Sequence, residues 1–357
     1  MKNILGRTIA FFVHPTLAGF TVLAIAVGIT AVHAQSYNIT DLGAVAGDGT
    51  SMAFGLNDLG QAAGYSASPS GGVATLFSHG SATSLGTLGG TDQSFAEAIN
   101  ASGEVAGYDF PSSGISQAFI YSNGRMKDIH SASLFPFGTT ATGINNLGQV
   151  VGYGWTTSAN SHPFLYTGTA MIDLGTPGGP DGTALAISDA GQVVGNLTTS
   201  NGISHGFLYA NGIMIDLGVP SGATSSTADA INIHSQIVGT LTVGGSSHAA
   251  LWSGGVWTDL GVLPGATLGT LATGINASGQ IVGVAIFPAI YARHGGRGIT
   301  HVGFIILNGA PVDLDTLIPA GSGFKITGAT AINDSGDILC NAINSSKSFR
   351  AVLLTPR

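Results

Sequence analysis

Short apolar segments separated by turn residues recur along this chain, and four of them make up each period. In the third period they lie at residues 140–145, 149–153, 162–166 and 171–174. Clusters of Gly, Asn, Ser or Pro separate them, and none reaches the ten or more residues typical of a helix. The pattern therefore predicts four β-strands in each period.

One motif marks the end of every first segment: Ala or Gly, then Ile or Leu, then an Asn or Ser that we call the anchor residue. The anchor residues are Asn57, Asn100, Asn145, Ser188, Asn232, Asn276 and Asn333. A spacing in the mid-forties is typical of repeat architectures. An antiparallel meander of four strands, repeated seven times, predicts an all-β fold: a seven-bladed β-propeller of four-stranded antiparallel blades.

The turns support this assignment. After the anchor residue, Gly148 and Gly279 occupy a position that predicts a left-handed backbone, and Ser235 replaces glycine there in the fifth repeat. We expect that hairpin to be strained, because residues with a β-carbon pay about 1–2 kcal/mol for this conformation. Tight turns between the third and fourth strands are predicted at Asn123-Gly124, Asn211-Gly212 and Asn308-Gly309.

The two ends of the repeat region complement each other. Residues 37–43 form a lone copy of a fourth segment, and the last repeat ends after its third segment, at residues 349–354. We expect the N-terminal strand to complete the last blade and close the ring, which removes exposed strand edges. Small residues in the first segments, as at 227–230, predict that these strands are innermost. The opposite order, with the third strand innermost, closes the ring equally well.

Residues 1–34 have the pattern of an export signal. Lys2 and Arg7 precede an uncharged apolar run at 16–32, and Val32-His33-Ala34 offers small residues before a cut at Gln35. An uncleaved membrane anchor is the alternative, because the run approaches spanning length. We expect a signal peptide at 1–34 and a single propeller domain at 35–357. The mature protein would be secreted, extracellular or periplasmic, without membrane association.

Composition narrows the class of partner. The formal net charge is −8, only 8% of residues are charged, and all 18 acidic residues follow residue 34. Nucleic acid is therefore not an expected partner, because binding it needs clustered bases. The apolar content of 44% argues against disorder. Cys340 is the only cysteine, so no intramolecular disulfide forms. It stands where other repeats have Gly, which predicts a small packed side chain.

The repeat units resemble the HAF-repeat family, bacterial proteins expected to be extracellular and named for a His-Ala-Phe tripeptide. Here the tripeptide takes the forms His162-Pro163-Phe164, His205-Gly206-Phe207, His248-Ala249-Ala250 and Gln117-Ala118-Phe119. The resemblance covers essentially all of residues 37–357. It implies secretion and a repeat fold, but it implies no reaction and no functional residues.

The recurring histidines precede aspartates by 11 or 12 residues. The pairs are His162 and Asp173, His205 and Asp216, His248 and Asp259, and His301 and Asp313. Residues so spaced lie nearly opposite across a tight turn, so each pair predicts a hydrogen bond within a blade. Metal or acid–base sites are the functional interpretation. Repetition favours structural ties, since an active site is normally built once, and we expect no metal and no cofactor.

The sixth repeat is interrupted. From Gly283 to His301 the spacing is 18 residues, against 10 from Gly195 to His205. Non-repeating loops on a rigid scaffold commonly carry binding residues. We therefore expect a ligand-binding face, with a solvated insertion as the alternative. Its candidate residues are Tyr291, Arg293, His294 and Arg297 from the insertion, with Asp109, Trp155 and Asp315 from the same face.

Familiar catalytic motifs are absent from the sequence, including Gly-x-Ser-x-Gly and His-Glu-x-x-His. The sequence favours a monomeric binding or interaction protein that uses its loop-rich face to hold a small molecule, a glycan or a surface protein. One alternative is a secreted hydrolase or lyase acting on a carbohydrate or other small substrate at the axial pocket near Arg293 and His294. The other is a structural surface protein. The sequence does not decide whether the protein is an enzyme.

Overall fold

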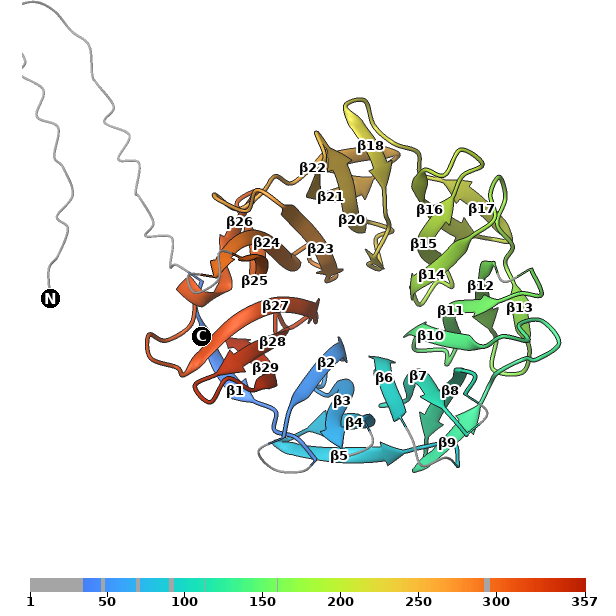
Figure 1. Ribbon diagram of the computed structural model, residues 1–357, viewed down its shortest axis with the longest axis horizontal. Coiled ribbons are helices and arrows are strands. Elements are labelled where there is room, and N and C mark those ends of the chain that lie inside the picture. The colour runs from blue at the N-terminus through green and yellow to red at the C-terminus, as the bar shows by residue number, and fades with distance from the viewer. Residues whose placement is uncertain are drawn as a thin grey trace, which may run out of the picture. The chain divides into compact units, whose positions relative to one another are not determined.

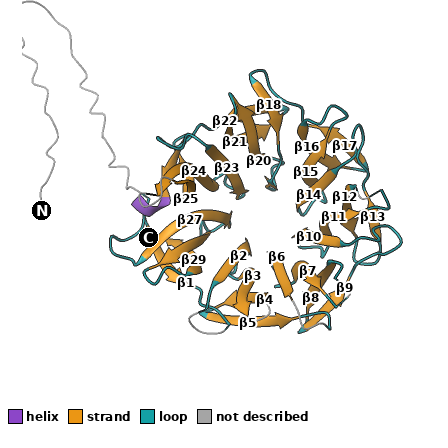
Figure 2. Ribbon diagram, in the orientation of Figure 1, coloured by secondary structure: helices purple, strands orange, loops and turns teal. Residues whose placement is uncertain are grey.

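The structure is a computed structural model that describes residues 35–45, 49–68, 71–89, 93–112, 114–158, 160–291 and 296–357. The predicted signal peptide, residues 1–34, lies outside these ranges. The described chain is all-β, with one short 3-10 turn, η1 (Leu314–Thr316), shown in purple in Figure 2. No helix within these ranges has the length and apolar character needed to cross a bilayer.

Four sheets follow one another along the chain, each an antiparallel meander. They contain β2 (Ser51–Leu56), β3 (Ala62–Ser68), β4 (Gly71–Ser78) and β5 (Ser81–Gly86); β6 (Gln93–Ile99), β7 (Val105–Phe110), β8 (Gln117–Ser122) and β9 (Arg125–Asp128); β10 (Thr139–Ile144), β11 (Val150–Trp155), β12 (Ser161–Tyr166) and β13 (Met171–Asp173); and β14 (Gly182–Ile187), β15 (Val193–Thr198), β16 (Ser204–Ala210) and β17 (Ile213–Asp216).

A nine-stranded sheet comes next. It contains β18 (Ala223–Ser226), β19 (Ala230–Ile231), β20 (Ile237–Val243), β21 (Ser246–Ser253), β22 (Val256–Asp259), β23 (Gly269–Ile275), β24 (Ile281–Tyr291), β25 (Gly296–Leu307) and β26 (Ala310–Asp313). These strands form two meanders, and the single parallel pair Ser247–Gly269 joins them.

The last sheet unites the two ends of the described chain. Its order is β1 (Tyr37–Asp41), β29 (Phe349–Pro356), β28 (Ile338–Asn344) and β27 (Phe324–Ile332). β1 pairs antiparallel with β29, from Tyr37 opposite Pro356 to Asp41 opposite Val352. Tyr37 is fully buried in the core of this sheet, which makes β1 part of the packed structure.

The sheets stand around a common centre, with β2, β6, β10, β14, β23 and β27 nearest to it (Figure 1). These are the first strands of their repeats, so the small first segments are innermost. A cavity lined by residues of all seven repeats lies at this centre, and we call it the channel. The turns that follow the anchor residues lie at one end of the channel, which we call the turn end. The connections from second to third strands emerge at the opposite end, the loop end.

Glycine in the second strand permits close packing between strands. A β-carbon at Gly152 would lie 2.0 Å from the carbonyl oxygen of Thr140 and 2.9 Å from the buried ring of Phe164. Cys340 takes the equivalent place in the last sheet and is fully buried, as predicted. There β27 has an additional register shift, between Ile326 and Gly328, which accompanies the larger side chain.

The predicted turns are present. Gly148 and Gly279 have φ angles of 72° and 80°, and Ser235 adopts the same left-handed conformation at 57°. Asn123, Asn211 and Asn308 have φ angles of 52° to 53°, each followed by a left-handed glycine. Two successive positive φ angles identify the tight hairpin turn that matches strand twist.

Candidate functional site

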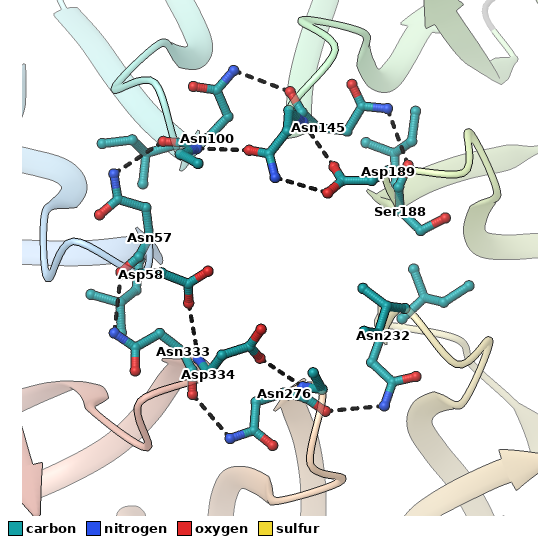
Figure 3. Close-up of a pocket in the computed structure, with 18 of the residues that line it drawn as sticks. Asn57, Asp58, Asn100, Asn145, Ser188, Asp189, Asn232, Asn276, Asn333 and Asp334 are labelled. Carbon is teal, nitrogen blue, oxygen red and sulfur yellow. Dashed lines mark hydrogen bonds between the residues drawn. The ribbon is translucent and has the colours of Figure 1, made fainter.

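At the turn end, the anchor side chains form what we call the asparagine ring. Each anchor Asn places its Oδ1 on backbone amides of its own turn and points its Nδ2 at the next repeat. Asn57 Nδ2 donates to Asn100 O at 3.0 Å, and Asn333 Nδ2 donates to Asn57 O at 3.2 Å. The bonds run around the opening with one interruption, between Ser188 and Asn232 (Figure 3). Serine is too short to make this bond.

Three carboxylates stand beside the asparagine ring and also join repeats. Asp189 accepts the backbone and side-chain amides of Asn146 at 2.9 and 2.8 Å. Asp334 accepts Ala277 N at 2.7 Å, and Asp58 accepts Asp334 N at 2.9 Å. The described residues contain no group of three or more His, Cys, Asp or Glu arranged to hold a metal ion. The turn end contains a cavity of about 220 Å³. We interpret the polar residues around it as structural.

The interior of the channel is lined by one residue from each repeat, three positions before the anchor residue. These channel residues are Phe54, Glu97, Thr142, Leu185, Asp229, Thr273 and Thr330. In six repeats this residue sits at a register shift of the innermost strand. A β-bulge re-aims a side chain, and here it turns the extra residue toward the channel.

Threonine at this position makes a hydrogen bond that links two repeats. Thr142 Oγ1 donates to Ala184 O at 2.9 Å, and Thr330 Oγ1 donates to Ala53 O at 3.1 Å. Thr273 makes the corresponding bond to its neighbouring repeat at 2.9 Å. Each threonine therefore links two repeats and satisfies a buried carbonyl. A carboxylate cannot donate this bond, so Glu97 and Asp229 call for another explanation.

The loop end opens into a cavity of about 620 Å³, which we call the axial cavity. Glu97 and Asp229 supply its two carboxyl groups, and Phe54 and Leu185 supply apolar walls. Leu271 and Ala272 add further apolar surface, and hydroxyl groups line the remainder, from Thr142, Ser225, Thr227, Thr240, Thr242, Ser247 and Thr273. The lining contains no Lys, Arg or His among the described residues.

The side chain of Glu97 makes no hydrogen bond or ion pair within the described part of the chain. Burial raises the pKa of its carboxyl to about 7. Tyr65 and Tyr108 lie close enough for its charge to act on them. The pKa of Tyr65 is raised, and that of Tyr108 is raised to about 12, in both cases by burial first and then by Glu97. The carboxyl is thus half-buried in the axial cavity without a protein partner among the described residues.

Asp229 lies where the fifth innermost strand is interrupted between β18 and β19. It accepts a hydrogen bond from Thr227 Oγ1 at 2.9 Å. Asn196, from the preceding repeat, also bonds its carboxylate and accepts Ala228 N at 3.0 Å. Burial raises the pKa of Asp229 to about 6, because desolvation outweighs these bonds. The irregular strand therefore holds a second protonatable carboxyl at the channel.

Aromatic rings lead from the axial cavity toward the rim, and we call them the aromatic track. The ring centroids are separated by 6.1, 5.1, 5.2 and 5.6 Å along Phe54, Tyr65, Phe95, Tyr108 and Phe110. At the outer end, Phe110, Phe137 and Trp155 line a pocket of about 320 Å³. Half-buried rings that contact one another present an apolar surface in continuity with the axial cavity.

The sequence-predicted site is only partly described. Arg293 and His294 lie outside the described residues, while Tyr291 and Arg297 belong to β24 and β25. The insertion was expected to be a loop, and this is corrected: it extends the β24–β25 hairpin, with pairing as far as Tyr291 opposite Gly296. Val284, Ile286, Phe287, Ile290 and Tyr291 favour a strand and support the extension, although Pro288 interrupts them.

The structure does not bring the other three candidates together. Asp109 is fully buried, and its Oδ2 accepts Leu88 N at 2.7 Å, so its placement on an exposed face was wrong. Alternation along β7 turns Tyr108 outward and Asp109 inward. Trp155 lies in the outer aromatic pocket. Asp315 lies in η1, where its Oδ1 accepts Ile326 N at 2.9 Å and burial raises its pKa.

Three of the four predicted His–Asp hydrogen bonds are present. His162, His205 and His248 place Nδ1 at 2.9, 2.8 and 2.7 Å from an Oδ2 atom of Asp173, Asp216 and Asp259.

The prediction for His301 and Asp313 was wrong, since no hydrogen bond joins them. Asp313 pairs with Phe304, three residues after His301, whereas Asp216 pairs with Phe207, two residues after His205. The odd offset turns His301 to the other face of the sheet.

Sequence reasoning missed Glu97 and Asp229. A signal existed: the third position before the anchor residue differs in chemistry between repeats, whereas the apolar residue just before the anchor hardly changes.

Arg350 was also missed. It occupies the place of His205 in the last sheet, where Val352 pairs with Asp41 as Phe207 pairs with Asp216.

No family model matches the chain, and no curated protein matches it either. Similar solved structures include TolB from Acinetobacter baumannii, with 12% identity, a TM-score of 0.46, and coverage of 83% of this chain and 65% of TolB. A puromycin hydrolase mutant complexed with PGG has 13% identity and a TM-score of 0.52, with coverage of 87% and 53%. A mutant of Aleuria aurantia lectin in complex with alpha-methyl-L-fucoside has 12% identity and a TM-score of 0.37, with coverage of 90% and 94%.

At these identities the similarity concerns the fold alone, and it rests on the puromycin hydrolase structure, of which this chain spans about half. The fold is β-propeller-like and all-β.

Proposed function

We propose that residues 35–357 form a closed, seven-bladed β-propeller that binds a small ligand in its axial cavity. The seven anchor motifs and the two meanders of the nine-stranded sheet support the number of blades. Support for closure comes from the β1–β29 pairing and from the bonds of Asn333 to Asn57 and Thr330 to Ala53. These contacts join the last repeat to the first.

The observation that carries the binding function is the unpartnered carboxyl of Glu97 in the axial cavity. A carboxyl that is partly desolvated without a protein partner costs free energy. Thr142, Thr273 and Thr330 show that threonine satisfies the fold at the same position. A departure from the locally best residue is typical of functional sites, and a half-buried acid with a raised pKa in a cavity is a functional-site candidate. Contact with a ligand accounts for Glu97.

The export signal pattern and the HAF-repeat resemblance support a role outside the cytoplasm. The ligand is then a small molecule or a glycan present in the periplasm or the surroundings of the cell. The β24–β25 hairpin, paired as far as Tyr291 opposite Gly296, is a separate candidate surface for binding.

The test is a small-molecule screen read out by melting temperature, comparing the natural chain with Glu97→Thr. This variant inserts the residue that three other repeats use and should remain folded. A ligand should raise the melting temperature of the natural protein and have little effect on Glu97→Thr. Equal stabilisation of both proteins by every compound found would place the site elsewhere.

A hydrolase is the second candidate, favoured by two carboxyls with raised pKa values that line one cavity. Such pairs perform general acid–base chemistry when one is protonated and the other ionised. Turnover of glycosides or esters that disappears in Glu97→Gln and in Asp229→Asn, with both variants folded, would establish it. Ligand binding without turnover would leave the binding function.

A further inference from the structure

We propose that the ligand of the axial cavity is an organic cation, an amine or a quaternary ammonium compound of small-molecule size. This inference rests on the proposed binding function and adds the charge of the ligand. It depends on the polar lining, the aromatic wall and the size of the axial cavity.

The lining carries negative charge without compensation. Glu97 and Asp229 come from the second and fifth repeats, and no basic side chain among the described residues lines the same cavity. Two carboxylates that share a cavity repel each other and attract a cation. The mature chain is also acidic overall, which adds to the negative potential. An anionic ligand would meet repulsion from both groups.

The aromatic wall fits an ammonium group. Phe54 lines the axial cavity together with Glu97, and Tyr65 stands behind it with its ring centroid 6.1 Å from that of Phe54. Cations bind the faces of aromatic rings, and recognition of quaternary ammonium ligands commonly combines such rings with acidic groups. Hydroxyl oxygens of Thr142, Thr227 and Thr240 can accept hydrogen bonds from a primary or secondary ammonium.

Size argues for an organic cation over a metal ion. About 620 Å³ accommodates a small organic molecule. A bare metal ion needs several oxygen ligands within about 2.6 Å. The described residues include no cluster that meets this need.

The pH dependence of binding gives an independent test of the charge of the ligand. The groups that act on Glu97 are Tyr65 and Tyr108, and those that bond Asp229 are Thr227 and Asn196. The pKa values of both tyrosines are raised above their ordinary value of 10, so the two carboxyls control the charge of the cavity in the neutral range. Binding a cation favours ionised carboxylates, so affinity should rise from pH 5.5 to pH 8 and binding should release protons. A neutral ligand that accepts a hydrogen bond from a protonated carboxyl would show the opposite dependence.

The experiment uses the exported form of the protein and calorimetric titration with choline and spermidine. Its neutral comparison is 3,3-dimethylbutan-1-ol, which replaces the ammonium nitrogen of choline by carbon. We expect at least one ammonium probe to bind, and choline to bind at least tenfold more tightly than its neutral analogue. Glu97→Gln and Asp229→Asn should each weaken binding tenfold or more. They preserve side-chain size and remove one charge.

Glu104→Gln is the matched control. It removes one negative charge at the turn end and introduces the residue that five other repeats have at that position, including Gln149 and Gln280. Affinity for the ammonium probe should change less than twofold. An equal loss in this control and in Glu97→Gln would show a general charge effect and overturn the assignment to the cavity.

The remaining outcomes separate this inference from the proposed function. Equal binding of choline and the neutral analogue, or binding of neutral sugars alone, overturns the cationic ligand and keeps the cavity as a site. Failure of both ammonium probes to bind also overturns it. A broad screen that finds no small molecule able to raise the melting temperature counts against the proposed function itself.

Discussion

Arg350 and Asp41, 309 residues apart, form the pair that His205 and Asp216 form 11 residues apart. Arg350 Nε lies 3.1 Å from both carboxylate oxygens of Asp41, and its Nη1 donates to Gly49 O at 2.7 Å. The other carboxylate contact is repeated as well, since Asp41 and Asp216 each accept the backbone amide of a glycine two residues later. A recurring tie within a sheet thus joins the two ends of the described chain.

We predict that Arg350→Ala lowers the free energy of unfolding by about 1–3 kcal/mol, because it leaves Asp41 without its charged partner in a partly buried site. His205→Ala removes the same kind of contact from a more exposed place and should cost about 1 kcal/mol or less. Denaturant titration measures both values. Equally small losses of stability in both variants would mean that the Arg350–Asp41 pair contributes no more than a His–Asp pair.

The left-handed turn positions give a second prediction. Gly279→Ala should destabilise by about 1–2 kcal/mol, because alanine is strained at its φ of 80°. Ser235→Gly relieves the same strain and loses the bond from Ser235 Oγ to Gln192 Oε1 at 2.9 Å, so it should be neutral or stabilising. Urea midpoints measure the order of the two variants. A stabilised Gly279→Ala would refute the turn argument.

The interruption of the asparagine ring between Ser188 and Asn232 gives a third prediction. Ser188→Asn introduces the donor that the other six anchor residues supply and should stabilise by about 0.5–1.5 kcal/mol, the usual net value of a hydrogen bond. Asn145→Ser is the reciprocal change. It removes the bond to Ser188 O at 3.1 Å and should destabilise by a similar or larger amount. Melting temperatures of the two variants should move in opposite directions, and movement in the same direction would contradict the proposed role.

The raised pKa of Glu97 makes stability depend on pH. In the folded protein this carboxyl titrates at about 7 instead of at its ordinary value of 4.5. Between these values the folded state binds a proton that the unfolded state has released, so its contribution to stability falls as pH rises from 4.5 to 7 and is constant above. Glu97→Thr should remove this fall.

We expect Glu97→Thr to be more stable than the natural chain at pH 8 by about 1–3 kcal/mol, a range that allows for screening by water in the channel. The difference should shrink at pH 4.5. Asp229 contributes in the same direction near its pKa of about 6, so Asp229→Asn serves as the comparison. A difference that does not change with pH would show that ionisation of Glu97 carries no cost.

The fold could be predicted from the sequence because the residues that determine it are local and repeated. The turn after each anchor residue and the Asn-Gly hairpins need a left-handed backbone, and few residues supply it without strain. The small first segments indicated the innermost strands for a steric reason. Even the missing hydrogen bond between His301 and Asp313 could have been predicted. These residues are 12 positions apart, whereas the residues of the other pairs are 11 apart.

The candidate site was harder to predict from the sequence, because a β-bulge changes the face of the sheet toward which a side chain points. Alternation places Ala96 and Glu97 on opposite faces of β6, but it does not show that the bulge turns Glu97 toward the channel. Asp109 was misplaced for a different reason: its charge suggested a surface position, although its side chain is fully buried. Asp229 depends on an interrupted strand and on Asn196 from another repeat, a combination of distant contacts that spacing does not reveal.

The pairing of β1 with β29 affects how the protein is made. During synthesis β1 emerges before every other strand, whereas its partner β29 emerges after all the others. Until then Tyr37 lacks its burial site and the last sheet is incomplete. Such distant pairing slows folding.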